Sequence, residues 1–169
     1  MISVAQQMTH QPTKHAQDRN SVYRRSSWLM RHVVNPITLL TVGKLGVDDH
    51  MGTRVLEVQG RISRRWRATP VRLLELDGHG YLVAPQGETD WVRNLRARGN
   101  GCLRLGSHVT EFRAVELEDE EKLPALRAYF RRYWSLVARM TVVTSPDVPD
   151  NELMEAAPLH PVFRLESEC

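Results

Sequence analysis

The chain has 169 residues and a mass of 19.4 kDa, the usual size of one domain. Its 41% hydrophobic and 25% charged residues exclude a wholly disordered chain, a collagen and a coiled-coil rod. No apolar run approaches the roughly 18 residues of a transmembrane helix. The net charge of +3 permits an anionic ligand, nucleic acid or a membrane surface as partner, without choosing among them.

Arginine dominates the basic residues. Only Lys14, Lys44 and Lys122 are lysines, which leaves 20 arginines among the 23 basic residues. The planar guanidinium suits bidentate capture of phosphate and carboxylate, although codon bias explains the overall count equally well. Cys102 and Cys169 make neither a disulfide framework nor a metal site, so both are expected to be free thiols in a reducing cytoplasm.

The first part of the chain divides into a polar and an apolar segment. Residues 1–25 are polar and unpatterned, which predicts a disordered N-terminal tail before a single domain over residues 26–169. Residues 27–46 carry an apolar helical stripe, interrupted at Asn35-Pro36. This segment is interpreted either as a helix covering the core or as an interfacial helix touching a membrane.

Strand signals then follow in series, mostly with hairpin connections. Asp77-Gly78-His79-Gly80 is a strong turn sequence, and Gly106-Ser107-His108 joins another pair. The six predicted strands are Arg54–Gln59, Thr69–Leu76, Tyr81–Ala84, Cys102–Leu105, Val109–Leu117 and Val162–Leu165. They indicate an α+β fold, with an antiparallel barrel or strongly curved sheet of about six strands and flanking helices.

Two helices are expected between the strands. The first has Thr89 as N-cap and Gly99 at its end, with Arg98 on its solvent side. The second covers Asp119–Met140 and has an acidic first turn. Residues 141–161 contain four prolines and are predicted to be a long loop.

The densest chemical signal is the segment Gly60–Val71. It contains four arginines and a serine but no acidic residue, and it links two predicted strands. We therefore expect an exposed loop that binds an anion through arginine side chains, the Ser63 hydroxyl and backbone N–H groups. The alternative is a solvated basic turn without a ligand.

The start of the short helix is a second candidate site. Its free N–H groups suit a phosphate, Trp91 offers a flat surface, and Asn94 lies one turn later. The alternative is a capped helix with Trp91 in the core. No dinucleotide-binding, P-loop, nucleophile-elbow or metal-ligand pattern occurs, so an enzyme built on this chain needs a cofactor to carry its chemistry.

Several segments together resemble the deazaflavin-dependent nitroreductase family over about residues 34–166. They are Gly60-Arg61-x-Ser63-x-x-x-Arg67-x-Thr69-Pro70-Val71, Gly80-Tyr81-Leu82-Val83-Ala84, the Gly87 turn, Trp91-x-x-Asn94-Leu95, Phe112–Leu117 and Pro161–Leu165. The resemblance implies a split β-barrel that binds coenzyme F420 and transfers a hydride to quinones, nitroaromatics or other conjugated acceptors.

The resemblance also implies roles for individual residues. It places Gly60, Arg61, Ser63, Arg65, Arg67, Thr69, Pro70, Trp91 and Asn94 in the cofactor site. Within this set, Ser63, Arg65 and Arg67 are expected to hold the phosphate and acidic tail, and Thr69 and Pro70 to line the deazaflavin. Arg64 stands where the commoner pattern has glycine, so it must avoid a positive φ or accept strain.

The long predicted helix contains two candidate donors of a proton to the reduced acceptor. Tyr129 and Tyr133 are four residues apart there and are the candidate catalytic residues on the acceptor side. The alternative for both is core packing. No metal is expected.

Two rival functions stay open. One is an FMN-binding split-barrel oxidoreductase, and the other is a non-enzymatic anion-binding module. The expected partner is a small-molecule acceptor, without specific nucleic acid, and the protein is expected to be a monomer or homodimer. It is expected in the cytoplasm, with a peripheral contact at the inner face of the membrane as a further prediction.

Overall fold

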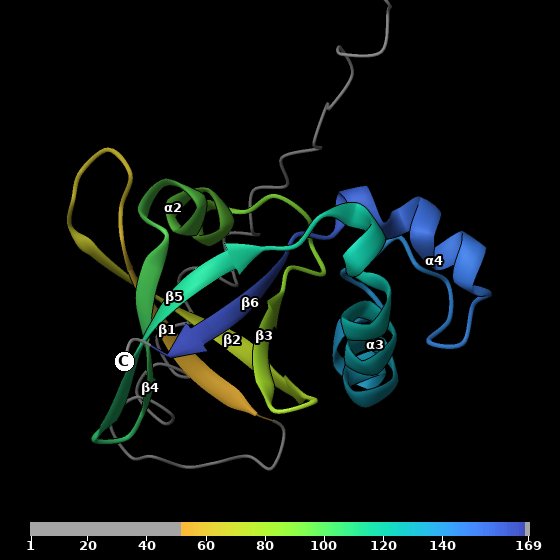
Figure 1. Ribbon diagram of the computed structural model, residues 1–169, viewed down its shortest axis with the longest axis horizontal. Helices are drawn as coiled ribbons and strands as arrows, with labels where there is room; N and C mark the ends of the chain where they lie inside the picture. The colour runs from red at the N-terminus through yellow and green to blue at the C-terminus, as the bar shows by residue number, and fades with distance from the viewer. Residues whose placement is uncertain (1–51, 168–169) are drawn as a thin grey trace, which may run out of the picture.

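The computed structural model describes residues 52–167, which form a closed β-barrel with helices at one end and along one side (Figure 1). Residues 1–25, the segment 27–46 and Cys169 lie outside the described residues. The strands are β1 (Thr53–Gln59), β2 (Trp66–Leu76), β3 (His79–Val83), β4 (Asn100–Leu105), β5 (His108–Glu116) and β6 (Val162–Ser167). The helices are α2 (Asp90–Arg98), α3 (Leu123–Val137) and α4 (Asp150–Ala156), with 3₁₀ turns η2 (Asp119–Glu121) and η3 (Ala157–Leu159).

The strands close in the order β1-β2-β3-β6-β5-β4, and each neighbouring pair is antiparallel. This confirms the predicted barrel of about six antiparallel strands with flanking helices. Leu76 pairs with His79, so Asp77 and Gly78 alone form the turn between β2 and β3. Both have positive φ (51° and 77°), as a type I′ hairpin turn requires.

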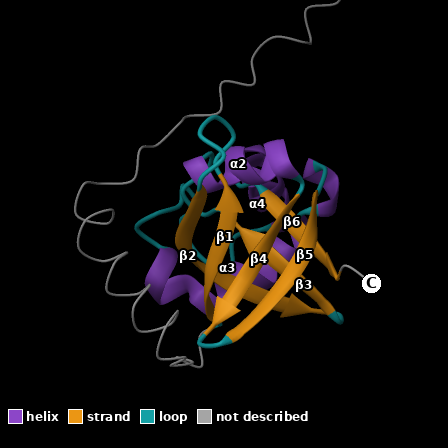
Figure 2. Ribbon diagram, turned by 90° about the vertical axis from the view of Figure 1, so that its left-hand side faces the viewer, coloured by secondary structure: helices purple, strands orange, loops and turns teal. Residues whose placement is uncertain are grey.

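The barrel interior is filled with apolar side chains. Leu56, Val58, Leu82, Phe112 and Phe163 come from alternating strand positions and are almost completely buried. Helix α2 lies across one end of the barrel (Figure 2) and adds buried apolar side chains to the same cluster. A planar ligand therefore has no room inside the barrel.

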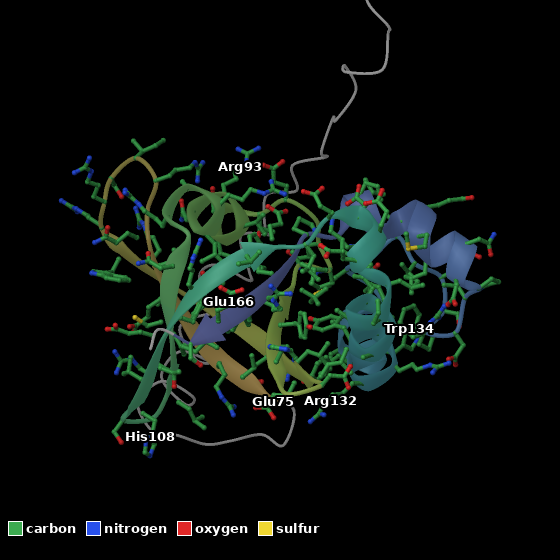
Figure 3. The ribbon with its side chains drawn as sticks, in the orientation of Figure 1. Glu75, Arg93, His108, Arg132, Trp134 and Glu166 are labelled. Atoms are coloured by element: carbon green, nitrogen blue, oxygen red, sulfur yellow. The ribbon has the colours of Figure 1, made fainter. Side chains whose placement is uncertain are left out.

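A second apolar layer lies on the outside of β2 and β3. Helix α3 packs there, and α4 lies beyond it (Figure 1). Leu126 and Phe130 of α3 are fully buried with Leu74 and Val83 of the two strands. Figure 3 places Trp134 on the side of α3 that faces away from the barrel.

The structure corrects three predicted boundaries. β2 begins at Trp66 rather than Thr69, because the ladder with β1 continues through residues that are exposed and show no apolar alternation. The helix predicted over 119–140 is the turn η2 followed by α3. Residues 141–161 contain α4 and η3, which the sequence did not reveal because Leu153 is the only buried residue of α4.

Candidate functional site

The predicted arginine loop is the turn of residues 60–65 between β1 and β2; together with Trp66 and Arg67, the first two residues of β2, it is called the arginine loop below. It extends beyond the barrel beside α2 (Figure 1). The Gly60 N–H donates to the Arg65 carbonyl, and the Arg64 N–H donates to the Gly60 carbonyl, both at 2.9 Å. A Cβ on Gly60 would lie 2.9 Å from Ser63 Oγ, so a larger residue there would displace the exposed Ser63 side chain.

Arg64 takes the conformation that glycine favours. Its φ is 54°, in the left-handed region, where a side chain costs roughly 1–2 kcal/mol. Of the two outcomes expected for this position, the chain accepts the strain.

One face of α2 holds the arginine loop. Asn94 Oδ1 accepts from the Arg61 backbone N–H at 3.1 Å and from Arg61 Nη1 at 3.0 Å. The same Nη1 lies 3.4 Å from Asp90 Oδ1. Arg98 Nη2 donates to the Gly60 carbonyl at 3.2 Å, so the prediction that Arg98 lies on the solvent side was wrong. Its spacing of four from Asn94 places both on one helix face, a signal present in the sequence.

Three arginines around the loop keep their charge unpaired. Among residues 52–167, the guanidinium groups of Arg64, Arg65 and Arg67 make no hydrogen bond or ion pair. All three side chains are exposed. Ile62 and Trp66 beside them are also exposed, at 86% and 59%. The loop therefore presents three positive charges to solvent, including Arg64, which was not among the predicted site residues.

Strand geometry places Thr69 and Pro70, two of the predicted cofactor contacts, on opposite faces of β2. Arg67 and Thr69 pair with Val58 and Leu56, whose side chains lie inside the barrel. Side chains alternate along a strand, so Pro70 lies on the outer face of β2. The side chains of Thr69 and Pro70 therefore cannot line one pocket together.

Trp91, another predicted site residue, is partly buried and packs against the barrel core. The Trp91 ring packs against Phe163, with ring centres 5.9 Å apart. Thr89 occupies the N-cap position, but its hydroxyl makes no capping bond and is buried without a partner among the described residues. The contact with Phe163 favours the packing alternative for Trp91, whereas the capping bond of that alternative is not formed.

The two candidate catalytic tyrosines lie in the layer under α3. Tyr129 and Tyr133 are 2% and 1% exposed. The Tyr133 hydroxyl donates to the Leu73 carbonyl at 2.9 Å. Burial raises the pKa of Tyr129 well above its usual range, with the nearby Arg72 opposing this rise. These surroundings favour core packing for both, and their catalytic role stays a prediction.

A cleft that the sequence did not reveal lies beside α2. Its volume is about 150 Å³, and Met140, Val142, Leu159 and three prolines give it a mainly apolar lining. Arg96 in its wall donates to both carboxylate oxygens of Glu116, at 2.6 and 2.7 Å, and this hydrogen bonding raises the arginine pKa. The cleft combines four separate parts of the chain, namely 85–88, Arg96, Met140 with Val142, and 158–161, so no single motif could indicate it.

Within the described part of the chain, no three His, Cys, Asp or Glu side chains are grouped to hold a metal ion. No helix in residues 52–167 has the length and apolar character needed to cross a membrane. The described cysteine, Cys102, forms no disulfide.

Comparison with solved structures gives distant relatives of the same fold. A protein described as a domain-swapped dimer is 22% identical, with a TM-score of 0.50 over 71% of this chain and 82% of its own. A protein of unknown function from Agrobacterium tumefaciens is 18% identical, with a TM-score of 0.50 over 79% and 53%. An F420-H2 dependent reductase, FDR-A, is 22% identical, with a TM-score of 0.49 over 68% and 94%.

No curated protein matches the chain. The family model of the F420H(2)-dependent quinone reductases matches residues 29–149, which is well over half of the sequence. The matched segment includes the arginine loop and all of α2. The chain therefore belongs to the F420H2-dependent quinone reductase family and is an oxidoreductase that uses coenzyme F420.

Proposed function

We propose that the arginine loop binds the phosphate and glutamyl tail of F420 through Ser63, Arg65 and Arg67, with Arg64 as a third cation. The observation that carries this proposal is the group of three unpaired guanidiniums in a loop without acidic residues. Guanidinium forks and a hydroxyl match the oxygens of phosphate and carboxylate, so the donor set fits this part of the cofactor.

The deazaflavin ring binds outside the barrel, because the interior is filled. Pro70 lines the ring from the outer face of β2, whereas Thr69 directs its side chain the other way. Gly60 closes the turn through its backbone N–H and carbonyl, and Arg61, Trp91 and Asn94 support the site from the loop and α2. When bound in its reduced form, F420 supplies the hydride that the acceptor takes up. The chain itself binds, orients the reactants and excludes water.

Cofactor titration tests this assignment. We expect tighter binding of F420 than of FMN, because several arginines engage the longer anionic tail, and weaker binding as salt rises. Fluorescence titrations with both cofactors measure this. Tighter, salt-independent FMN binding would favour the FMN alternative. Binding of anions in general, with no preference for F420, would favour the non-enzymatic module.

The apolar cleft is our candidate for the acceptor, a quinone or, as a second class, a nitroaromatic. Its lining suits a flat apolar ring, and its Arg96 is already neutralised by Glu116. Pro85, in the lining of the cleft, follows the end of β3, and β3 pairs with β2. A deazaflavin ring held at Pro70 of β2 would therefore lie on the side of β2 toward Pro85 and the cleft. We place the acceptor in the cleft because Pro70, proposed to contact the deazaflavin, lies toward Pro85 of the cleft.

Filling the cleft tests its role. Val142 is 54% exposed, so Val142→Trp is expected to fold and to raise the KM for the quinone without changing F420 affinity. Stopped-flow oxidation of reduced F420 gives the first quantity and equilibrium titration the second. Val109→Trp, at an exposed position on β5, is the matched control. A loss of F420 affinity instead would place the deazaflavin in the cleft.

We also propose that the protein is a homodimer, supported by the fold it shares with the protein described as a domain-swapped dimer. Sedimentation equilibrium tests this, and a monomer at micromolar concentration would contradict it. A cytoplasmic location and a membrane contact of residues 27–46 stay predictions. Co-sedimentation of the full chain with anionic vesicles tests the membrane contact.

A further inference from the structure

The arginine loop contacts the body of the protein through one stripe of α2. Asp90, Asn94 and Arg98 are spaced four residues apart, so they follow one another along one face of the helix. Asn94 accepts two hydrogen bonds from Arg61, and Arg98 donates one to the Gly60 carbonyl. The stripe thus holds the loop at its first two residues.

Asn94 is buried and polar on a helix whose other buried residues are apolar. It is 5% exposed, and its neighbours Val92 and Leu95 belong to the barrel core. A buried amide oxygen is costly unless it is bonded, and here two donors of one arginine satisfy it. The oxygen is therefore committed to the loop rather than to a ligand. The core anchors α2, so Asn94 gives the loop a fixed point.

The loop needs such a fixed point because its own sequence opposes its shape. Arg61, Arg64, Arg65 and Arg67 lie within seven residues without an acidic residue among them, and like charges repel. Arg64 also holds a positive φ. Contacts from outside the loop must offset both effects if the guanidiniums are to stay together in the absence of an anion.

We infer that Asn94 is a positioning residue that braces the arginine loop against α2. Arg61 and Arg98 are the two arginines fixed in this brace, and Arg64, Arg65 and Arg67 are left to face the anion. The identity of that anion as the F420 tail rests on the proposed function. The brace itself belongs to the protein without cofactor and can be measured there.

Amide hydrogen exchange of the cofactor-free full chain tests the brace. Asn94→Ala is expected to speed exchange at residues 61–65 about tenfold or more, while the barrel strands keep their protection. Asn94→Asp keeps an oxygen acceptor in the same place and should restore slow exchange. Asn100→Ala, at an exposed asparagine just after α2, is the matched control. Unchanged exchange in the loop, or equal acceleration throughout the barrel, would overturn the inference.

A variant with a smaller effect keeps the test decisive if Asn94→Ala does not fold. Arg98→Ala removes only the bond to the Gly60 carbonyl and should speed exchange in the same loop by a few-fold. A loop that is unchanged in this variant would then overturn the brace.

A double-mutant cycle on F420 affinity separates bracing from direct contact. Arg61→Ala removes one of the two bonds to Asn94, and Asn94→Ala removes both. The double variant should therefore bind about as weakly as Asn94→Ala alone. Additive losses would mean separate contacts with the cofactor and would overturn the inference. If Arg65→Ala also binds F420 normally, the proposed function fails, whereas the exchange result still decides the brace.

Discussion

The arginine loop and the layer under α3 differ in whether their polar side chains have hydrogen-bond partners. Under α3 the buried polar groups are matched: Lys122 Nζ reaches Asp119 Oδ1 at 2.6 Å and the Ala157 carbonyl at 3.2 Å. The Tyr133 hydroxyl is likewise bonded to a strand carbonyl. At the loop, three guanidiniums are exposed and unpaired, and Arg64 has a positive φ. The first region stabilises the fold, and we propose that the second binds the cofactor, so substitutions should affect stability and binding separately.

Phe130→Ala should give the largest effect, on stability alone. The Phe130 ring is fully buried and contacts the rings of Tyr129, Trp134 and His160. Truncating such a ring leaves a cavity and costs about 3–5 kcal/mol. Urea unfolding measures the loss, and F420 titration of the folded fraction should give wild-type affinity. A parallel loss of affinity in the folded protein would show that the two regions are coupled.

Acid should weaken the same layer through His160. Burial lowers its pKa from 6.5 to about 4, helped by the charge of Lys122 and opposed by the hydrogen bond from Nδ1 to the Ala84 carbonyl. Between these values the unfolded chain binds a proton that the folded chain does not. The free energy of unfolding should therefore fall as pH drops from 6.5 toward 4, by about 3 kcal/mol in total.

Urea unfolding at pH 7 and pH 4.5 measures this dependence. His160→Asn keeps polar atoms at the site but removes the titration, so its stability should change less across the same range. A wild-type protein that is equally stable at both pH values would contradict the low pKa.

Loss of a loop arginine should change binding and leave stability intact. Arg65→Ala and Arg67→Ala each remove a charge-assisted contact of about 1.5–3 kcal/mol, which corresponds to at least a tenfold loss of F420 affinity. Arg67→Lys should recover only part of it, because a point charge does not reproduce the guanidinium fork. Fluorescence titration and thermal melting of each variant measure the two quantities.

The control for charge must lie away from α2, because Arg98 contacts the loop. Arg132 is exposed at the lower end of α3, far from the loop in Figure 3, and its guanidinium lies over the Tyr133 ring. Arg132→Ala should leave F420 affinity unchanged. An equal loss in this variant would mean that binding follows overall charge rather than the loop.

The sequence predicted best where a signal is local. The predicted turn at Asp77–Gly80 is confirmed at its first two residues, and the predicted helix end at Gly99 is confirmed, because Asp77, Gly78 and Gly99 tolerate positive φ. The start of β2 was missed because Trp66–Ala68 are stabilised by ladder bonds to β1 rather than by burial. Helix α4 was missed because one buried leucine makes no stripe. Contacts with residues distant in the sequence, rather than a local pattern, therefore determine the start of β2 and the formation of α4.

The candidate site likewise has features that the sequence reveals and features that only the fold reveals. The unpaired arginines form a local cluster and could be read directly from the sequence. The contact between Arg61 and Asn94 spans 33 residues, so only the fold reveals that these two bind each other. The opposite directions of Thr69 and Pro70 follow from strand periodicity, but only once both residues are known to lie within β2.

The smallest expected effect is the difference between two substitutions of Arg64, which distinguishes the cost of backbone strain from the loss of charge. Arg64→Gly and Arg64→Ala remove the same guanidinium, but only glycine adopts a φ of 54° without steric cost. Glycine also loses more backbone entropy on folding, so Arg64→Gly should be more stable than Arg64→Ala by only about 0.5–1 kcal/mol. Urea unfolding of the pair measures this difference, and F420 titration should show equal losses of affinity. If both variants unfold alike, the positive φ costs little; if the glycine variant binds more weakly, the strained backbone itself helps to present the neighbouring arginines to the anion.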